Sequence, residues 1–130
     1  MALNAKKQIY WRRFIQSFRY ASRGFICAVK QEQNMKLHVV FAVIVIGMAF
    51  VLKVPLTHWL VLIAVIGVVF ALELINTALE RTVDLVTDEY HPLAEQAKDI
   101  AAAAVFVFSI AAVIIGMLIF YEPLISLFAT

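Results

Sequence analysis

The sequence predicts an all-α integral membrane protein, built as one domain from an N-terminal amphipathic surface helix and three transmembrane helices. Composition is the first reason: 64% of the 130 residues are hydrophobic and 15% are charged, against roughly 45–50% and about 25% in soluble domains. The second reason is that three long apolar segments contain no formal charge. So few charges could not cover the apolar surface of a soluble protein of this size.

The scarce residue types exclude several functional classes. A single cysteine, Cys27, allows neither an intrachain disulfide nor a cysteine zinc cluster. Four glycines and no Gly-x-x-x-x-Gly-Lys-Ser/Thr pattern exclude a P-loop. The net charge of +2 does not indicate a nucleic-acid-binding protein.

The three uncharged segments, residues 37–52, 54–72 and 100–121, are the predicted transmembrane cores. Each is close to the roughly 20 residues that a helix needs to cross a bilayer. The first two are joined by a tight turn, in which Pro55 either ends one helix or begins the next. Residues 81–99 are rich in charged and polar side chains and are predicted to form a cytoplasmic connection between the second and third spans.

Residues 1–34 are predicted to form a basic amphipathic helix on the cytoplasmic membrane surface. At 100° per residue, one side of this segment is apolar and another is basic. The apolar side contains Trp11, Phe14, Ile15, Phe18, Phe25, Ile26 and Val29, and the basic side Arg12, Arg19, Arg23 and Lys30. Such a helix either anchors the protein only or also attracts an anionic ligand.

The basic residues predict the orientation in the membrane. Eight of the eleven Lys and Arg residues precede the first span, and Arg81 and Lys98 lie between the second and third. Only Lys53 falls on the other side. The N-terminus is therefore expected in the cytoplasm and the C-terminus outside.

A polar stripe follows the second span. Glu73, Asn76, Glu80 and Asp84 fall within about 80° of one another on a helix. Carboxylates facing lipid are costly, so the stripe should face protein or a wet cavity. It suits either a divalent cation, which prefers oxygen ligands, or a general base at a dry boundary. The alternative is that Glu80 and Asp84 simply lie in water.

Other polar residues have two possible roles each. Lys98, at the start of the third span, can meet phosphate oxygens or extend to the interface, and Asp99 is placed to cap the helix N-terminus. His91 can be a metal ligand, although a solvated or capping role is favoured. Glu32 can pair with Lys30 or Lys36, or complete a cation site with Glu80.

Together these residues resemble the signature of the small bacterial diacylglycerol kinase family, which includes the undecaprenol kinases. The resemblance covers nearly the whole chain and rests on residues 73–80, 83–84, 88–91 and 97–105, and upstream on Arg13, Tyr20, Gly24 and Glu32. It implies a three-span, homotrimeric enzyme of the bacterial cytoplasmic membrane with active sites between subunits. Such an enzyme moves the γ-phosphate of ATP, with Mg²⁺ as cofactor, to a lipid alcohol.

The resemblance also implies roles for single residues. Glu73 is the general base for the lipid hydroxyl, Asn76 orients that region, and Glu32 and Glu80 hold magnesium ions that bridge the ATP phosphates. Six further residues are expected around the nucleotide: Arg13, Tyr20, Asp84, His91, Lys98 and Asp99.

Residues 73–80 and 84–92, with Pro92 after His91, look more like the Gram-positive undecaprenol kinases than the diacylglycerol kinases. The expected product is therefore undecaprenyl phosphate, and the alternative is phosphatidic acid. A different class, a small cation- or proton-conducting subunit, would explain an acidic stripe. It would not explain Glu32, Asn76 and the Lys98–Asp99 pair as a group.

Overall fold

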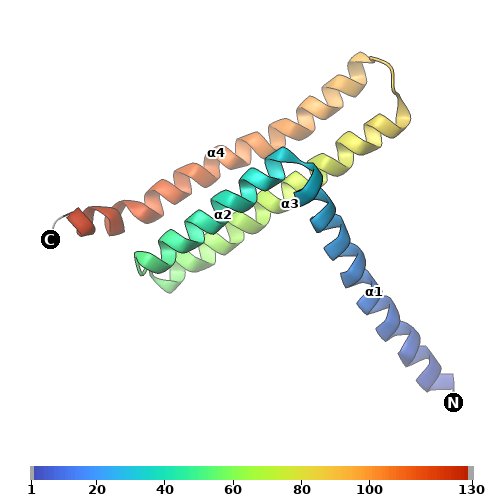
Figure 1. Cartoon of the computed structure of the whole chain (residues 1–130), viewed down its shortest axis with the longest axis horizontal. Helices are drawn as coiled ribbons and strands as arrows, with labels where there is room; N and C mark the ends of the chain where they lie inside the picture. Colours follow the sequence, from blue (N-terminus) through green and yellow to red (C-terminus); the bar gives the residue numbers. More distant parts are fainter. Residues whose placement is uncertain (1, 129–130) are drawn as a thin grey trace.

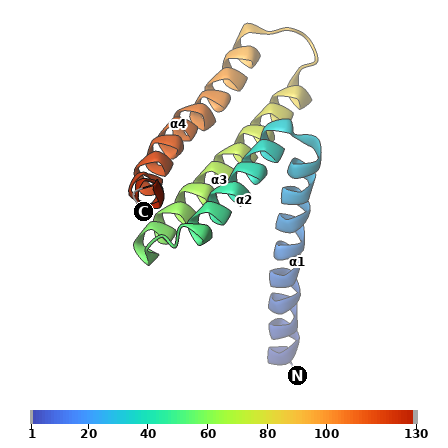
Figure 2. The same ribbon diagram turned by 60° about the vertical axis from the view of Figure 1, so that its left-hand side comes forward.

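The structure, a computed structural model, describes residues 2–128, and these form four helices: α1 (Ala2–Gln31), α2 (Gln33–Val51), α3 (Leu56–Val86) and α4 (Pro92–Phe128). Helices α2, α3 and α4 run side by side with alternating direction (Figure 1). Helix α1 leads away from this bundle, and a view turned by 60° shows the same arrangement (Figure 2). The all-helical class with three apolar helices is confirmed.

Helices α2, α3 and α4 are each long and apolar enough to cross a membrane. Helix α3 has 31 residues and α4 has 37, which corresponds to about 46 and 55 Å at 1.5 Å per residue. Both exceed the hydrocarbon core of about 30 Å. Most of the expected connection over residues 81–99 is therefore helical, because 81–86 complete α3 and 92–99 begin α4. Only residues 87–91 form the loop.

The chain changes direction at Glu32, between α1 and α2. Its backbone is extended, with φ −94° and ψ 127°. Its N–H donates to the carbonyl of Ala28 in the last turn of α1, and its own carbonyl accepts from the N–H of Lys36. Glu32 thus ends one helix and begins the next. The predicted surface helix is shorter than residues 1–34 as a result.

The turn between α2 and α3 contains the one non-glycine residue with positive φ in residues 2–128, Lys53 at φ 51°. The N–H groups of Lys53 and Val54 donate to the carbonyls of Phe50 and Ala49, which satisfies the end of α2. Pro55 precedes the first residue of α3 and accepts from the N–H of His58. Of its two expected roles, it begins the next helix.

The apolar and polar contacts lie at opposite ends of the bundle. Near the α2–α3 turn, α2, α3 and α4 share a buried cluster of Ala49, Val54, Leu62, Ile119 and Phe120. At the other end, α1 contacts α2 and α3, and the polar residues of α3 follow. The most apolar windows of the three spans are only 17%, 17% and 11% buried. Most of their surface therefore faces lipid or other chains.

Candidate active site

The polar stripe on α3 is buried where the sequence places it against the apolar run. Glu73 is 2% exposed, and Asn76 and Thr77 are each 6% exposed. The side-chain amide of Asn76 donates to Oε1 of Glu80 at 2.9 Å. Because these positions are one helical turn apart, α3 alone brings three of the predicted residues together.

Asn76 has one polar atom without a partner. Its Oδ1 is buried and accepts no hydrogen bond from any residue that the structure describes. A buried amide oxygen without a partner is costly in an apolar setting. The oxygen is therefore available to a bound group that arrives beside Glu73.

Glu32 is paired with a residue that the sequence did not indicate. Arg81 Nη2 donates to Glu32 Oε1 at 2.9 Å and to Gln31 Oε1 at 2.7 Å, and its Nη1 lies 3.6 Å from Cys27 Sγ. Of the two possibilities that the sequence left open for Glu32, the ion pair with Lys30 or Lys36 is not the one formed, because Arg81 takes that place. In the sequence, Arg81 indicates only the orientation in the membrane. Its position directly after Glu80 also places it at the polar end of α3.

Arg81 brings Glu32 toward the α3 carboxylates. Coulombic repulsion from both Glu80 and Glu32 acts on Glu73. Three carboxyl groups from α3 and the α1–α2 junction therefore share one region. Within residues 2–128 no group of three or more His, Cys, Asp or Glu residues has the geometry of a complete metal site. Mg²⁺ commonly takes only one or two carboxylates together with water and phosphate, so the donor set fits that ion.

Lys98 and Asp84 form an ion pair between the start of α4 and the end of α3. Their side chains are 37% and 61% exposed, so water reaches both. Asp84 lies eleven residues beyond Glu73, a distance of about 16 Å along a helix axis. The Lys98–Asp84 pair therefore lies further along α3 than Glu73 and is not in contact with it.

The N-terminus of α4 is capped by His91. The backbone N–H of Leu93 donates to Nδ1 of His91 at 3.2 Å, so the capping role favoured for this histidine is confirmed. The expected capping role of Asp99 is wrong, because α4 begins at Pro92 and Asp99 is an exposed residue about two turns inside the helix.

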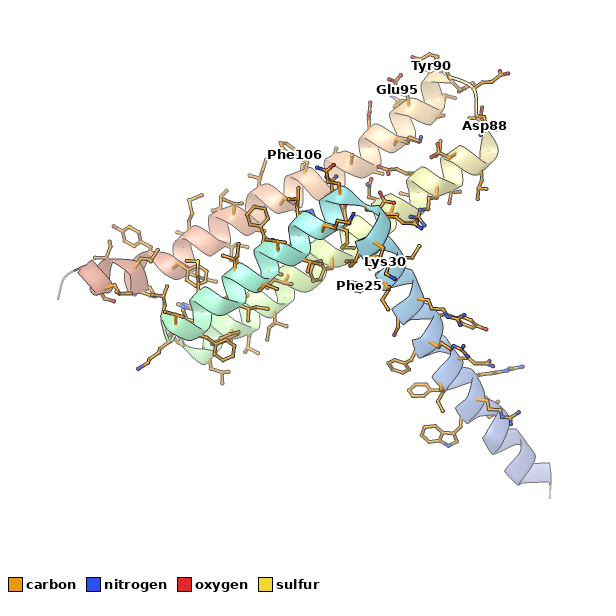
Figure 3. All side chains as sticks on the ribbon, in the orientation of Figure 1. Phe25, Lys30, Asp88, Tyr90, Glu95 and Phe106 are labelled. Atoms are coloured by element: carbon orange, nitrogen blue, oxygen red, sulfur yellow. The ribbon has the colours of Figure 1, made fainter. Side chains whose placement is uncertain are left out.

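A polar pocket of about 380 Å³ lies where the 87–91 loop joins α3 and α4. It collects three residues expected around the nucleotide: Asp84, His91 and Lys98. On its rim the hydroxyl of Tyr90 donates to Glu95 Oε2 at 2.8 Å, and this hydrogen bond raises the pKa of Tyr90. Figure 3 shows Tyr90 and Glu95 together at the start of α4, with Asp88 across the loop.

Arg13 and Tyr20 are not brought to the other residues within this one chain. Both are exposed on α1, and this helix leads away from the bundle (Figure 1). Their expected contact with the nucleotide therefore needs a movement of α1 or a neighbouring subunit.

His38 is a further polar residue at the site. Its Nε2 lies 3.9 Å from Oε2 of Glu73, and the side chains are 21% and 3% exposed, respectively. His38 also lines an apolar pocket of about 380 Å³ between α2, α3 and α4. The sequence does contain a signal for His38, because it is a polar residue at the start of the apolar segment 37–52. The absence of formal charge, by which that segment is recognised, does not reveal a neutral histidine.

Residues 19–120 match the family of the prokaryotic diacylglycerol kinases. The chain belongs to this family. This membership makes it a kinase that phosphorylates a lipid alcohol, in agreement with the sequence prediction.

Relatives of this chain carry names that differ in the lipid substrate. An undecaprenol kinase of Bacillus subtilis is 45% identical over 112 residues, which cover 86% of this chain and 91% of that protein. A diacylglycerol kinase of Synechocystis is also 45% identical, over 85% of this chain but 64% of its own length. A diacylglycerol kinase of Pseudomonas aeruginosa is 37% identical over 78% of this chain and 83% of its own.

Proposed function

We propose that this kinase transfers the γ-phosphate of MgATP to undecaprenol and so produces undecaprenyl phosphate. One observation carries the choice of lipid: the undecaprenol kinase of Bacillus subtilis combines 45% identity with coverage of 91% of its own length. The Synechocystis diacylglycerol kinase matches the identity but over 64% of its length, and this keeps diacylglycerol as the alternative substrate.

Phosphoryl transfer to a lipid alcohol needs a general base that is within reach of the lipid hydroxyl. Glu73 is buried at the inner end of the α3 apolar run, where an alcohol can arrive by diffusion within the membrane. Its carboxylate accepts the hydroxyl proton while the oxygen attacks the γ-phosphorus. The apolar pocket that starts at His38 and continues to Phe120 supports a place for the lipid chain. Asn76 holds Glu80 in position and offers Oδ1 to the substrates.

Glu32 and Glu80 would hold Mg²⁺. Both are carboxylates at the cytoplasmic side of the spans, and both interact electrostatically with Glu73. When bound, the ion neutralises charge on the phosphate oxygens. For Glu32 to bind it, the ion pair with Arg81 must loosen or be shared.

The nucleotide residues support a site shared between subunits of a homotrimer. Within one chain, Asp84 lies about 16 Å along α3 from Glu73 and is paired with Lys98. Arg13 and Tyr20 belong to α1, which leads away from the bundle (Figure 1). Lys98 of one subunit would then contact the nucleotide whose γ-phosphate lies beside Glu73 of another. His91 and Asp99 would then flank the nucleotide with Lys98. The exposed apolar faces of the three spans provide surface for such an assembly.

Helix α1 would lie on the cytoplasmic membrane surface, with the N-terminus inside and the C-terminus outside. The rings of Trp11, Phe14 and Phe18 touch in sequence along α1. Figure 3 supports this placement, because ring side chains gather along one side of the helix and long nitrogen-tipped chains along the other. The rings suit the interface and the basic chains suit anionic headgroups.

The test is a comparison of both lipid alcohols with the purified protein in the same bilayer. Turnover of MgATP should depend on added lipid alcohol, and kcat/KM should be higher for undecaprenol. A value for diacylglycerol tenfold above that for undecaprenol, or about 1.4 kcal/mol of transition-state preference, would reverse the choice of lipid and leave the kinase assignment intact.

A further inference from the structure

The proton that Glu73 accepts must leave the enzyme before the next turnover, and we propose that His38 carries it from Glu73 to water. This inference rests on the proposed role of Glu73 as the general base. The side chain of Glu73 is 3% exposed and that of His38 is 21% exposed. The carboxyl group is therefore almost fully enclosed, whereas the imidazole reaches the surface of the bundle two residues from the exposed Lys36, at the polar end of α2.

The two side chains are close enough for transfer after a small adjustment. His38 Nε2 and Glu73 Oε2 are 3.9 Å apart, longer than a hydrogen bond but within reach of a side-chain rotation. Catalytic hydrogen bonds are often long in free enzymes and shorten when substrate binds. His38 comes from α2 and Glu73 from α3, so the packing of the two helices fixes their relative position.

The other ionisable groups around Glu73 are already engaged. Glu80 accepts the hydrogen bond from Asn76 on α3, and Glu32, at the α1–α2 junction, is paired with Arg81. Both are also the proposed magnesium ligands, which stay deprotonated. Helix α4 contributes Ser109 and apolar residues to the pocket that His38 lines, and none of these titrates. Among the residues that the structure describes around Glu73, His38 is the acceptor that remains, and an imidazole changes charge near neutral pH.

The step balances as follows. The lipid hydroxyl oxygen bonds to the γ-phosphorus, the bond from that phosphorus to the β–γ bridging oxygen breaks, and ADP leaves. The hydroxyl proton goes to Glu73, which becomes neutral, and then to Nε2 of neutral His38, which becomes an imidazolium. Release of one proton to water restores both side chains.

Replacement of His38 tests this role. His38→Ala and His38→Gln should each lower kcat at least tenfold and leave KM for MgATP unchanged, since proton transfer by a positioned side chain typically contributes about 10²–10⁴-fold. Added imidazole should restore part of the kcat of His38→Ala, because the vacated space opens into the apolar pocket. The matched control is His58→Ala, near the opposite end of the bundle, which should keep its kcat and ignore imidazole.

The pH dependence provides the readout that a packing role would not change. Neutral His38 is the acceptor, so wild-type kcat should fall at acid pH, where the imidazole is already protonated before the transfer. His38→Gln should lose this acidic limb. Near-normal kcat in both His38 variants, or full activity in His38→Gln with no imidazole effect on His38→Ala, would overturn the relay. Glu73→Gln in the same assay separates the two ideas: if it stays active, the base assignment fails first.

Discussion

At the scale of single residues, the site depends on a difference in burial between two carboxylates that are about two helical turns apart. Glu73 is almost fully buried, whereas Glu80 is half-buried and in contact with Asn76. Two carboxylates seven residues apart on α3 therefore meet different surroundings. The buried Glu73 suits proton abstraction from a lipid, and the more exposed Glu80 suits a hydrated cation.

Glu73→Gln should keep the fold and MgATP binding but lower kcat by about 10²–10⁴-fold, the usual contribution of a general base. Gln preserves the size of the side chain and removes its ability to accept the proton. Steady-state kinetics with undecaprenol, together with nucleotide binding by calorimetry, check this prediction. Glu122→Gln, an exposed glutamate near the other end of α4, is the matched control. Near-normal turnover of Glu73→Gln would remove the base assignment.

Glu80→Gln should abolish activity and weaken nucleotide binding only when Mg²⁺ is present. The reason is that the loss of one carboxylate affects the ion and not the nucleotide alone. The measurement is ATP affinity in magnesium and in chelator. An equal loss of affinity in both conditions would indicate a folding defect instead, because Asn76 also loses its charged acceptor.

At the scale of elements, one side chain ties α1 to the bundle. Arg81 of α3 contacts Cys27 and Gln31 in the last turn of α1 and Glu32 just after it. These contacts set where α1 leaves the bundle, and they set the position of Glu32. The guanidinium reaches three partners because its planar donors fan out.

Arg81→Ala should loosen the junction between α1 and α2. Amide hydrogens of residues 27–32 should exchange a few-fold faster, and the Mg²⁺ concentration needed for half-maximal activity should change, since Glu32 loses its partner. Hydrogen exchange followed by mass spectrometry and a magnesium titration test both effects. Arg23→Ala, an exposed arginine of α1, should leave both unchanged. Unaltered exchange at the junction in Arg81→Ala would show that helix packing alone holds α1.

Sequence periodicity was sufficient for the helices and for the α3 stripe, because Glu73, Asn76 and Glu80 are neighbours on one helix. It could not find partners on different helices. The Arg81–Glu32 pair and the approach of His38 to Glu73 depend on how α1 and α2 pack against α3. Sequence periodicity also could not give the length of the loop between α3 and α4. The polar ends of these two helices have the composition of a loop, although they are helical.

At the scale of the whole molecule, the single chain separates the parts that phosphoryl transfer requires. The base and the carboxylates lie on one stripe of α3, while Lys98 is held by Asp84 about 16 Å further along that helix. In a homotrimer with shared sites, one bound nucleotide would connect Lys98 of one subunit with Glu73 of another. Such shared sites predict that two inactive variants can complement each other, which sites formed within one chain would not allow.

Mixing two inactive variants, Glu73→Gln and Lys98→Gln, should restore activity. If each site takes Glu73 from one subunit and Lys98 from its neighbour, every mixed trimer has one site with both native residues. Random equal mixing makes about three quarters of trimers mixed, so about one quarter of the wild-type rate should return. The assay combines the purified variants in denaturing detergent, refolds them together and measures ATP turnover with lipid. Variants refolded separately and mixed afterwards are the control. Activity no higher than this control would place both residues in the same subunit's site.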